Sequence, residues 1–242
     1  MIVTGDAVIL EQMCEERKCF RVKAKLPEYA KEISKNYLRH WFISTRSRLA
    51  QLGVFLQKVD FYEFIYNNEI HKMVVPYSFT NFNIELKPND KVCRFYTLRK
   101  SDRVTDEDLI EEIFQENNIK LKDGLVEIPV QPVKYMIVDY PKSMSELEEF
   151  GVDKYLERVD LENLVIKPRE FVVTESLPVK FPKDIYGVIR GSVDWKNNHL
   201  FVLPSSLIDG GFEGRIRFEL YNYGDKEIKN PKIEISLYKT KI

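Results

Sequence analysis

The sequence predicts a mainly β protein with a few short helices. Runs rich in Tyr, Phe, Val and Ile, residues that favour strands, recur along most of the 242 residues. Turn-favouring residues interrupt these runs about every eight to twelve positions, a spacing typical of β-sandwiches and barrels. A helical repeat of apolar residues is confined to a few segments, so we expect helices to contribute little to the fold.

Strand-like runs lie on both sides of one charged segment. Asn81–Leu86 and Val92–Leu98 flank Lys87-Pro88-Asn89-Asp90, whose residues favour a tight turn. The charged segment Arg99–Arg103 then separates two strand-rich halves. We therefore predict one domain at residues 1–100 and a second at residues 101–242. The remaining runs are Lys72–Tyr77, Phe171–Thr174, Ile185–Ile189 and Ile233–Tyr238.

Helix signals are concentrated in three segments. In Thr105–Asn118, Thr105 is a candidate N-cap with the acidic Asp108 three residues later, and a one-sided apolar pattern follows. Ser143–Phe150 has the same kind of start, with Ser143 as its N-cap. Pro27–Arg39 begins with a proline, which suits the first turn of a helix.

Composition narrows the classes of function. The 37 basic and 38 acidic residues are balanced, whereas nucleic-acid-binding domains usually carry a basic excess. Cys14, Cys19 and Cys93 form no C-x-x-C pair and the histidines lie far apart, so we expect reduced thiols and no metal site. No apolar run reaches the about 18 residues of a membrane helix, and the N-terminus lacks a signal-peptide pattern. We expect a soluble, cytoplasmic protein.

The most informative stretch is Pro204–Asn222. Its Ile-Asp-Gly-Gly-Phe-Glu-Gly turn leads into an alternating run that places Glu219 on one strand face with Arg217 and Tyr221. A buried carboxylate with suitable neighbours can activate water and then protonate a leaving group. The alternatives are a surface glutamate paired with a nearby arginine, and for Asp209 a structural place in the turn.

This turn and strand resemble the active-site hairpin of the dUTPase/dCTP deaminase family. The resemblance implies that Glu219 is the proton-shuttling glutamate and that Asp209 lies at the substrate sugar. It extends over residues 104–242 and implies the β-clip fold, a distorted antiparallel barrel. The order and spacing of five phrases carry it: Val104–Ile113, Ile128–Pro132, Lys167–Leu177, Phe181–Asp184 and Ile208–Gly214.

Residues 1–100 resemble a second, degenerate copy of the same fold, so two tandem copies are expected. Thr45–Val54 is close to the family's Arg-Ser-Ser-x-Ala-Arg-x-Gly-Leu motif, and Leu86–Cys93 matches a later turn and strand. No acidic hairpin lies between them. The resemblance implies active sites assembled between copies of the fold, within one chain or across a homo-oligomer.

Phosphate binding is where the sequence departs from the family. Asp194 and Trp195 stand where a small residue and a second arginine belong, and Gln51 replaces that arginine in the N-terminal copy. A carboxylate at Asp194 opposes phosphate binding. Because family members continue into a C-terminal tail that closes over the nucleotide and this sequence ends at Ile242, we expect no such lid. The resemblance implies these phosphate-binding residues: Arg190, Ser192, Lys196, Arg46, Ser47 and Arg48.

The implied substrate is a deoxypyrimidine nucleoside triphosphate, with Mg²⁺ accompanying the nucleotide and no membrane or nucleic-acid partner. Glu219 favours conversion of dCTP to dUTP and ammonia over a dUTPase reaction, because dUTPases carry no carboxylate at that position. A homo-oligomer, a trimer or a dimer, is expected. The altered phosphate loops support a second hypothesis, a non-catalytic nucleotide-binding or scaffold member of the same fold.

Overall fold

The chain forms two compact units in the computed structural model. Unit 1 contains Met1–Leu98 together with Asp139–Tyr155, and unit 2 contains Arg99–Val138 and Leu156–Thr240. The first division lies beside the charged segment at residues 99–103, but residues 139–155 pack with the N-terminal unit. The structure describes residues 1–14, 18–30, 41–80, 82, 84–114, 120–122, 124–192, 199–203 and 206–240.

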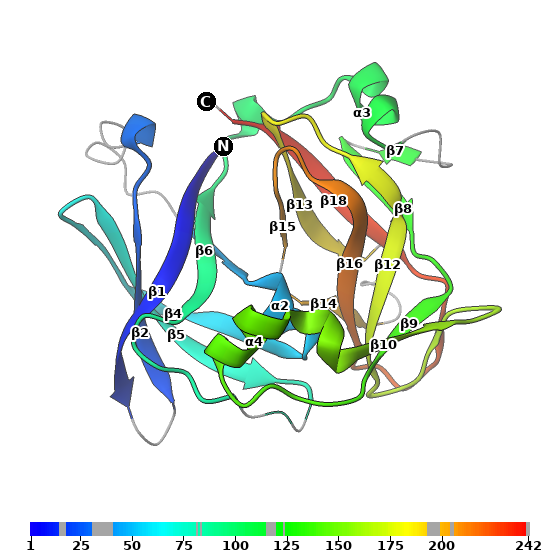
Figure 1. Ribbon diagram of the computed structural model, residues 1–242. Helices are drawn as coiled ribbons and strands as arrows, with labels where there is room; N and C mark the ends of the chain where they lie inside the picture. The colour runs from blue at the N-terminus through cyan, green and yellow to red at the C-terminus, as the bar shows by residue number, and fades with distance from the viewer. Residues whose placement is uncertain are drawn as a thin grey trace. The chain divides into compact units, whose positions relative to one another are not determined.

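Unit 1 contains a six-stranded antiparallel sheet with the strand order β3-β6-β1-β2-β5-β4. Its strands β1 and β6 lie side by side in Figure 1. Strand β2 shows why the sequence folds in this way, because its alternate residues Phe20, Val22 and Ala24 are buried. The strands are β1 (Ile2–Cys14), β2 (Cys19–Lys25), β3 (Phe42–Thr45), β4 (Val54–Tyr66), β5 (Glu69–Ser78) and β6 (Lys91–Thr97).

One predicted element of unit 1 lies mostly outside the described residues, and another differs from the structure. The helix predicted at Pro27–Arg39 is a 3-10 turn at Glu28–Ala30 in its described part, and residues 31–39 lie outside the described residues. The second element is the strand predicted at Asn81–Leu86. Its described residues form only an isolated bridge, from Glu85 to Ser143. The other helical elements are α2 (Ser47–Gln51), α4 (Met144–Phe150) and η3 (Val152–Tyr155).

Unit 2 packs two five-stranded antiparallel sheets around one apolar core. Their orders are β10-β9-β12-β16-β14 and β15-β13-β18-β8-β7, and β11 pairs with β17. The bounds are β7 (Lys120–Lys122), β8 (Leu125–Pro129), β9 (Val133–Ile137), β10 (Leu156–Asp160), β11 (Val165–Ile166), β12 (Phe171–Lys180), β13 (Ile185–Ser192), β14 (Leu200–Val202), β15 (Leu207–Ile208), β16 (Glu213–Asn222), β17 (Ile228–Lys229) and β18 (Lys232–Lys239).

Helix α3 (Glu107–Phe114) packs against β12 and buries Ile110, Ile113 and Phe114 in the core of unit 2. Its start differs from the prediction by one residue, because the Asp106 carboxylate accepts a hydrogen bond from the Leu109 amide at 3.3 Å. The short turn η2 (Lys100–Asp102) precedes it. The mainly β prediction is confirmed, with strands forming the framework of both units.

Candidate active site

The turn between β15 and β16 explains the glycine pair of the hairpin. Gly211 has a φ of +77°, a conformation that side chains disfavour, and a Cβ at Gly210 would lie 2.2 Å from the Lys183 carbonyl oxygen. The Phe212 amide donates to the Asp209 carbonyl at 3.1 Å and closes the turn. Asp209 therefore stands half-buried at the start of a turn whose backbone is tightly constrained.

Strand β16 separates apolar from polar residues by simple alternation. Ile216, Phe218 and Leu220 enter the core of unit 2, so the intervening residues Arg217 and Glu219 point to the opposite face. This face of the sheet is called the polar face below. Although it leaves the core, the Glu219 side chain is only 1% exposed. A carboxylate buried to this degree is uncommon and makes Glu219 a candidate for chemistry.

Strand register places other side chains in one row with Glu219. Glu219 of β16 pairs with Val173 of β12, Val173 pairs with Tyr135 of β9, and Tyr135 pairs with Arg158 of β10. Residues paired directly across antiparallel strands share a face of the sheet. Tyr135 and Arg158 therefore lie on the polar face with Glu219.

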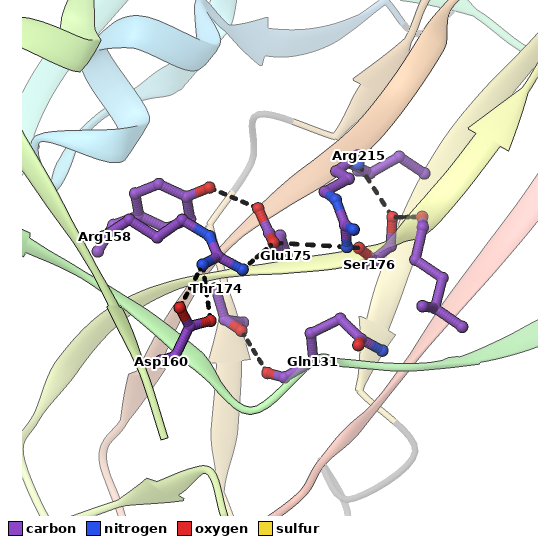
Figure 2. Close-up of polar contacts among 10 residues, drawn as sticks. Gln131, Arg158, Asp160, Thr174, Glu175, Ser176 and Arg215 are labelled. Carbon is purple, nitrogen blue, oxygen red and sulfur yellow. Dashed lines mark hydrogen bonds and ion pairs between the residues drawn. The ribbon is translucent and has the colours of Figure 1, made fainter. Parts of the chain in front are cut away.

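A second buried carboxylate, Glu175 of β12, is the centre of an ionic network on this face (Figure 2). Glu175 is 2% exposed, and its Oε1 lies 3.1 Å from Arg158 Nη2 and 3.5 Å from Arg215 Nη1. Arg158 Nη1 also lies 2.6 Å from the Asp160 carboxylate. Burying a charge is costly unless it is paired, and two arginines satisfy this requirement at Glu175.

Tyr135 connects Glu175 to Arg217. Its hydroxyl donates to Glu175 Oε2 at 2.5 Å, and the Arg217 guanidinium carbon lies 4.3 Å from the centre of its ring. Burial raises the pKa of Tyr135, and the hydrogen bond to Glu175 raises it further, so Tyr135 stays a neutral donor at physiological pH. The hydrogen bond to Glu175 is the main cause that raises the pKa of Arg158.

The sequence did not assign a role to Tyr135, Arg158, Glu175 or Arg215. The one available signal was Glu175 itself, a charged residue within the strand Phe171–Lys180, whose other buried residues are apolar or hydroxyl-bearing. Its partners lie on β9, β10 and β16, up to forty residues away in sequence. Only the register of those strands brings them together.

The predicted phosphate residues of unit 2 lie in the second sheet. Arg190 is exposed at a register shift of β13, and Ser192 ends that strand. Lys196, with Asp194 and Trp195, lies outside the described residues. Asp209 follows Ile208, which pairs with Gly187, so Asp209 and Arg190 lie toward opposite ends of the β13–β15 pairing. The structure does not bring these two residues together within unit 2.

The predicted phosphate residues of unit 1 surround the start of α2. Arg46 is the N-cap residue, Ser47 is exposed in the first turn, and Arg48 is half-buried. Arg46 Nη1 lies 2.9 Å from Glu148 of α4 and 4.0 Å from Asp6 of β1. One guanidinium expected to bind phosphate is therefore already paired with a carboxylate of its own unit.

The described part of the chain has neither a cluster of metal ligands nor a membrane-spanning helix. There, no group of three or more His, Cys, Asp and Glu residues is placed to hold a metal ion. None of its helices combines the length and the apolar character needed to span a bilayer. Cys19 and Cys93 are both buried, and burial raises the pKa of the Cys93 thiol far above the usual range.

Parts of the chain are similar in sequence to known dCTP deaminases. A dCTP deaminase of Pyrobaculum neutrophilum is 30% identical over 138 residues, which cover 55% of this chain and 70% of that protein. A dCTP deaminase of Desulfurococcus amylolyticus is 30% identical over 115 residues, or 46% of this chain and 59% of that protein. A dUMP-forming dCTP deaminase of Hydrogenobaculum sp. matches over 39% of its own length. No protein-family model matches the chain.

The structural comparison reaches further along the chain. A 2′-deoxycytidine 5′-triphosphate deaminase from Agrobacterium tumefaciens superposes with a TM-score of 0.63 over 97% of this chain and 76% of that one. The sequence identity is 13%, so the superposition establishes the fold alone. The predicted β-clip architecture is confirmed. That the N-terminal half is a degenerate copy stays a prediction.

Proposed function

The chain belongs to the dUTPase/dCTP deaminase superfamily, and on that premise we propose that it hydrolyses deoxypyrimidine nucleotides, converting dCTP to dUTP and ammonia. One observation carries the proposal. Glu219 is a buried carboxylate on the polar face of β16, at the position where the sequence resembles the family's catalytic hairpin. A carboxylate that is shielded from water and shares its sheet face with charged residues suits both halves of acid–base catalysis.

Deamination needs one group that first accepts and then returns a proton. In the proposed reaction Glu219 takes a proton from water, and the resulting hydroxide adds to C4 of cytosine. Glu219 passes that proton to N3 of the ring, then takes the proton of the new C4 hydroxyl and donates it to the amino group, so that the C4–N bond breaks and ammonia leaves as the carbonyl of uracil forms. Water is the only co-reactant, so atoms and electrons balance without a redox partner.

The remaining predicted residues take part in binding. We assign the substrate sugar to Asp209 and the phosphates to Arg190, Ser192 and Lys196, with Arg46, Ser47 and Arg48 as the alternative set. The resemblance to the family implies Mg²⁺, which would enter bound to the triphosphate oxygens. If Asp209 instead orients a water toward the α-phosphate, the reaction is that of a dUTPase.

A second candidate function is supported by the contacts of Arg46. Its ion pair with Glu148 at 2.9 Å occupies a guanidinium that a bound triphosphate would need. This favours a member of the family that binds nucleotide without turning it over, or that keeps only the fold for assembly. The two candidates differ in whether Glu219 is used.

The first test is a direct assay on the purified chain with dCTP or dUTP, with and without Mg²⁺. We expect ammonia release from dCTP, and a decrease of about 100-fold or more in Glu219→Gln, which keeps the side-chain shape but cannot transfer the proton. Nucleotide affinity, measured by the ligand-dependent rise in melting temperature, should stay near that of the wild type.

Glu213→Gln is the matched control, because Glu213 lies on the same strand and face but is exposed and paired with Lys180 at 3.1 Å. It should release ammonia at the wild-type rate. Full activity in Glu219→Gln would refute its role. Pyrophosphate from dUTP, without ammonia from dCTP, would assign a dUTPase, and stabilisation without either product would support the non-catalytic alternative.

A further inference from the structure

The polar face of unit 2 carries more positive than negative charge when Glu219 is left out. Within two residues of the Glu219 row the described residues supply Arg217 and Tyr221 on β16, Glu175 on β12, Tyr135 on β9, and Arg158 and Asp160 on β10. Arg215 joins them through its contact with Glu175. Three arginines thus face two carboxylates, and an ionised Glu219 brings the charges into balance.

Arg217 is the cation nearest to Glu219 along the strand. The two residues are two positions apart on one face of β16, which corresponds to about 7 Å between their Cα atoms. An opposite charge close to a carboxylate favours its ionised form and opposes the effect of burial. The position of the Arg217 guanidinium therefore affects whether Glu219 is charged.

A chain of three contacts holds Arg217 in place, and the first of them involves Arg217 itself. Its guanidinium lies over the Tyr135 ring at 4.3 Å, and the Tyr135 hydroxyl is anchored to Glu175 at 2.5 Å. Glu175 is in turn held by Arg158 at 3.1 Å. A planar guanidinium stacked on an aromatic ring keeps a defined orientation that a flexible lysine would not keep.

From this arrangement we propose that Tyr135 and Glu175 are positioning residues that hold Arg217 beside Glu219, so that the Glu219 carboxyl group stays ionised and ready to accept a proton from water. The proposal rests on the proposed function of Glu219 as the general base. It adds a set of residues, drawn from four strands, that prepare this base without touching the substrate.

The test is a carboxyl titration that does not depend on turnover. Protein labelled with ¹³C at the glutamate side chains is titrated by NMR, and Glu219→Gln identifies the Glu219 resonance. Replacing Arg217 by Gln should raise the pKa of Glu219 by about 1 to 3 units, because an attractive charge is lost. Arg217→Lys, which keeps the charge but loses the stacking, should give a smaller rise.

The positioning residues are tested in the same way. Tyr135→Leu removes both the ring and the hydroxyl and should raise the pKa of Glu219 in the direction seen for Arg217→Gln. Tyr135→Phe keeps the ring, is the variant least expected to disturb folding, and should give a smaller rise. Lys180→Gln, which removes an exposed positive charge from β12, should leave the pKa of Glu219 unchanged.

The pH profile of activity supplies a second readout. If Glu219 is the base, the acidic limb of kcat/KM for dCTP should shift to higher pH in Arg217→Gln, by the same amount as the pKa of Glu219. An unchanged Glu219 titration in Arg217→Gln or in Tyr135→Leu would overturn the proposal. If the pKa of Glu219 changes in the variants as predicted but the wild type releases no ammonia, the charge arrangement is supported and the deaminase assignment is wrong.

Discussion

Gly210 is a position at which the hairpin leaves no room for a side chain. A Cβ there would lie 2.2 Å from the Lys183 carbonyl oxygen and 2.9 Å from the Tyr186 ring. The obstructing oxygen belongs to the backbone and cannot rotate away as a flexible side chain could. The turn therefore requires a glycine at position 210, whether or not Asp209 binds a ligand.

We expect Gly210→Ala to lower the free energy of unfolding by about 1 to 3 kcal/mol, the usual cost of forcing extra atoms into a filled site. Chemical denaturation followed by circular dichroism measures this. Gly5→Ala is the control, because a Cβ at Gly5 meets nothing within 4 Å. Equal stability of the two variants would show that the backbone at Gly210 can adjust.

Sequence and structure agree at the residue level where the information is local. Alternation along one strand was enough to place Glu219 with Arg217 and Tyr221, because the period of a strand is fixed. Glu175, Tyr135 and their partners could not be predicted in this way. Their contacts depend on how four strands pair, and no pattern within a single strand encodes that register.

Among the helices, α4 follows its sequence signals most closely. The Ser143 hydroxyl accepts a hydrogen bond from the Glu146 amide at 3.2 Å, as its N-cap position predicts. The Glu146 carboxylate accepts one from the Lys142 amide at 2.9 Å and another from the Tyr155 hydroxyl at 3.0 Å. The Lys142 amide is the first cause that lowers the pKa of Glu146.

Ser143→Ala should therefore destabilise α4 by about 1 kcal/mol, because the Glu146 amide loses its side-chain acceptor. Amide hydrogen exchange within residues 144–150 should become faster in this variant. Ser101→Ala, which removes an exposed serine of η2, should leave exchange in α4 unchanged. Unaltered protection of α4 in Ser143→Ala would mean that packing, rather than the cap, sets its stability.

The start of α3 shows the limit of such signals. Thr105 and Asp106 are adjacent residues that can both cap a helix, and the structure uses Asp106. At residues 81–86 the strand pattern was present but a neighbouring strand was not, and a strand needs its neighbour to satisfy its backbone. The packing of residues 139–155 with unit 1 could not be predicted either, because it depends on contacts between segments that are far apart in the sequence.

At the scale of the whole molecule, the separation of Asp209 from Arg190 raises the question of how one nucleotide could contact both. The register of β13 and β15 places Asp209 beyond Gly187. Tyr186 and Arg190 are four positions apart, a span of about 13 Å along the strand. A site that uses both residues therefore favours one contribution from each of two chains.

A mixing experiment tests this arrangement. Asp209→Asn and Arg190→Gln should each be inactive alone if both residues serve dCTP turnover. Refolded together in equal amounts, they should recover about a quarter of the wild-type rate, since random assembly leaves that share of two-chain sites intact. Asp209→Asn mixed with Glu219→Gln should recover nothing, because both changes lie on the same hairpin.

The outcome also decides between the two sets of predicted phosphate residues. Recovery would assign the phosphates to Arg190 of a neighbouring chain and would make a homo-oligomer necessary for turnover. Activity of Arg190→Gln alone, with loss in Arg46→Gln, would instead assign them to the N-terminal copy. In that case Glu148→Gln should increase nucleotide affinity, because it releases the Arg46 guanidinium from its ion pair at 2.9 Å.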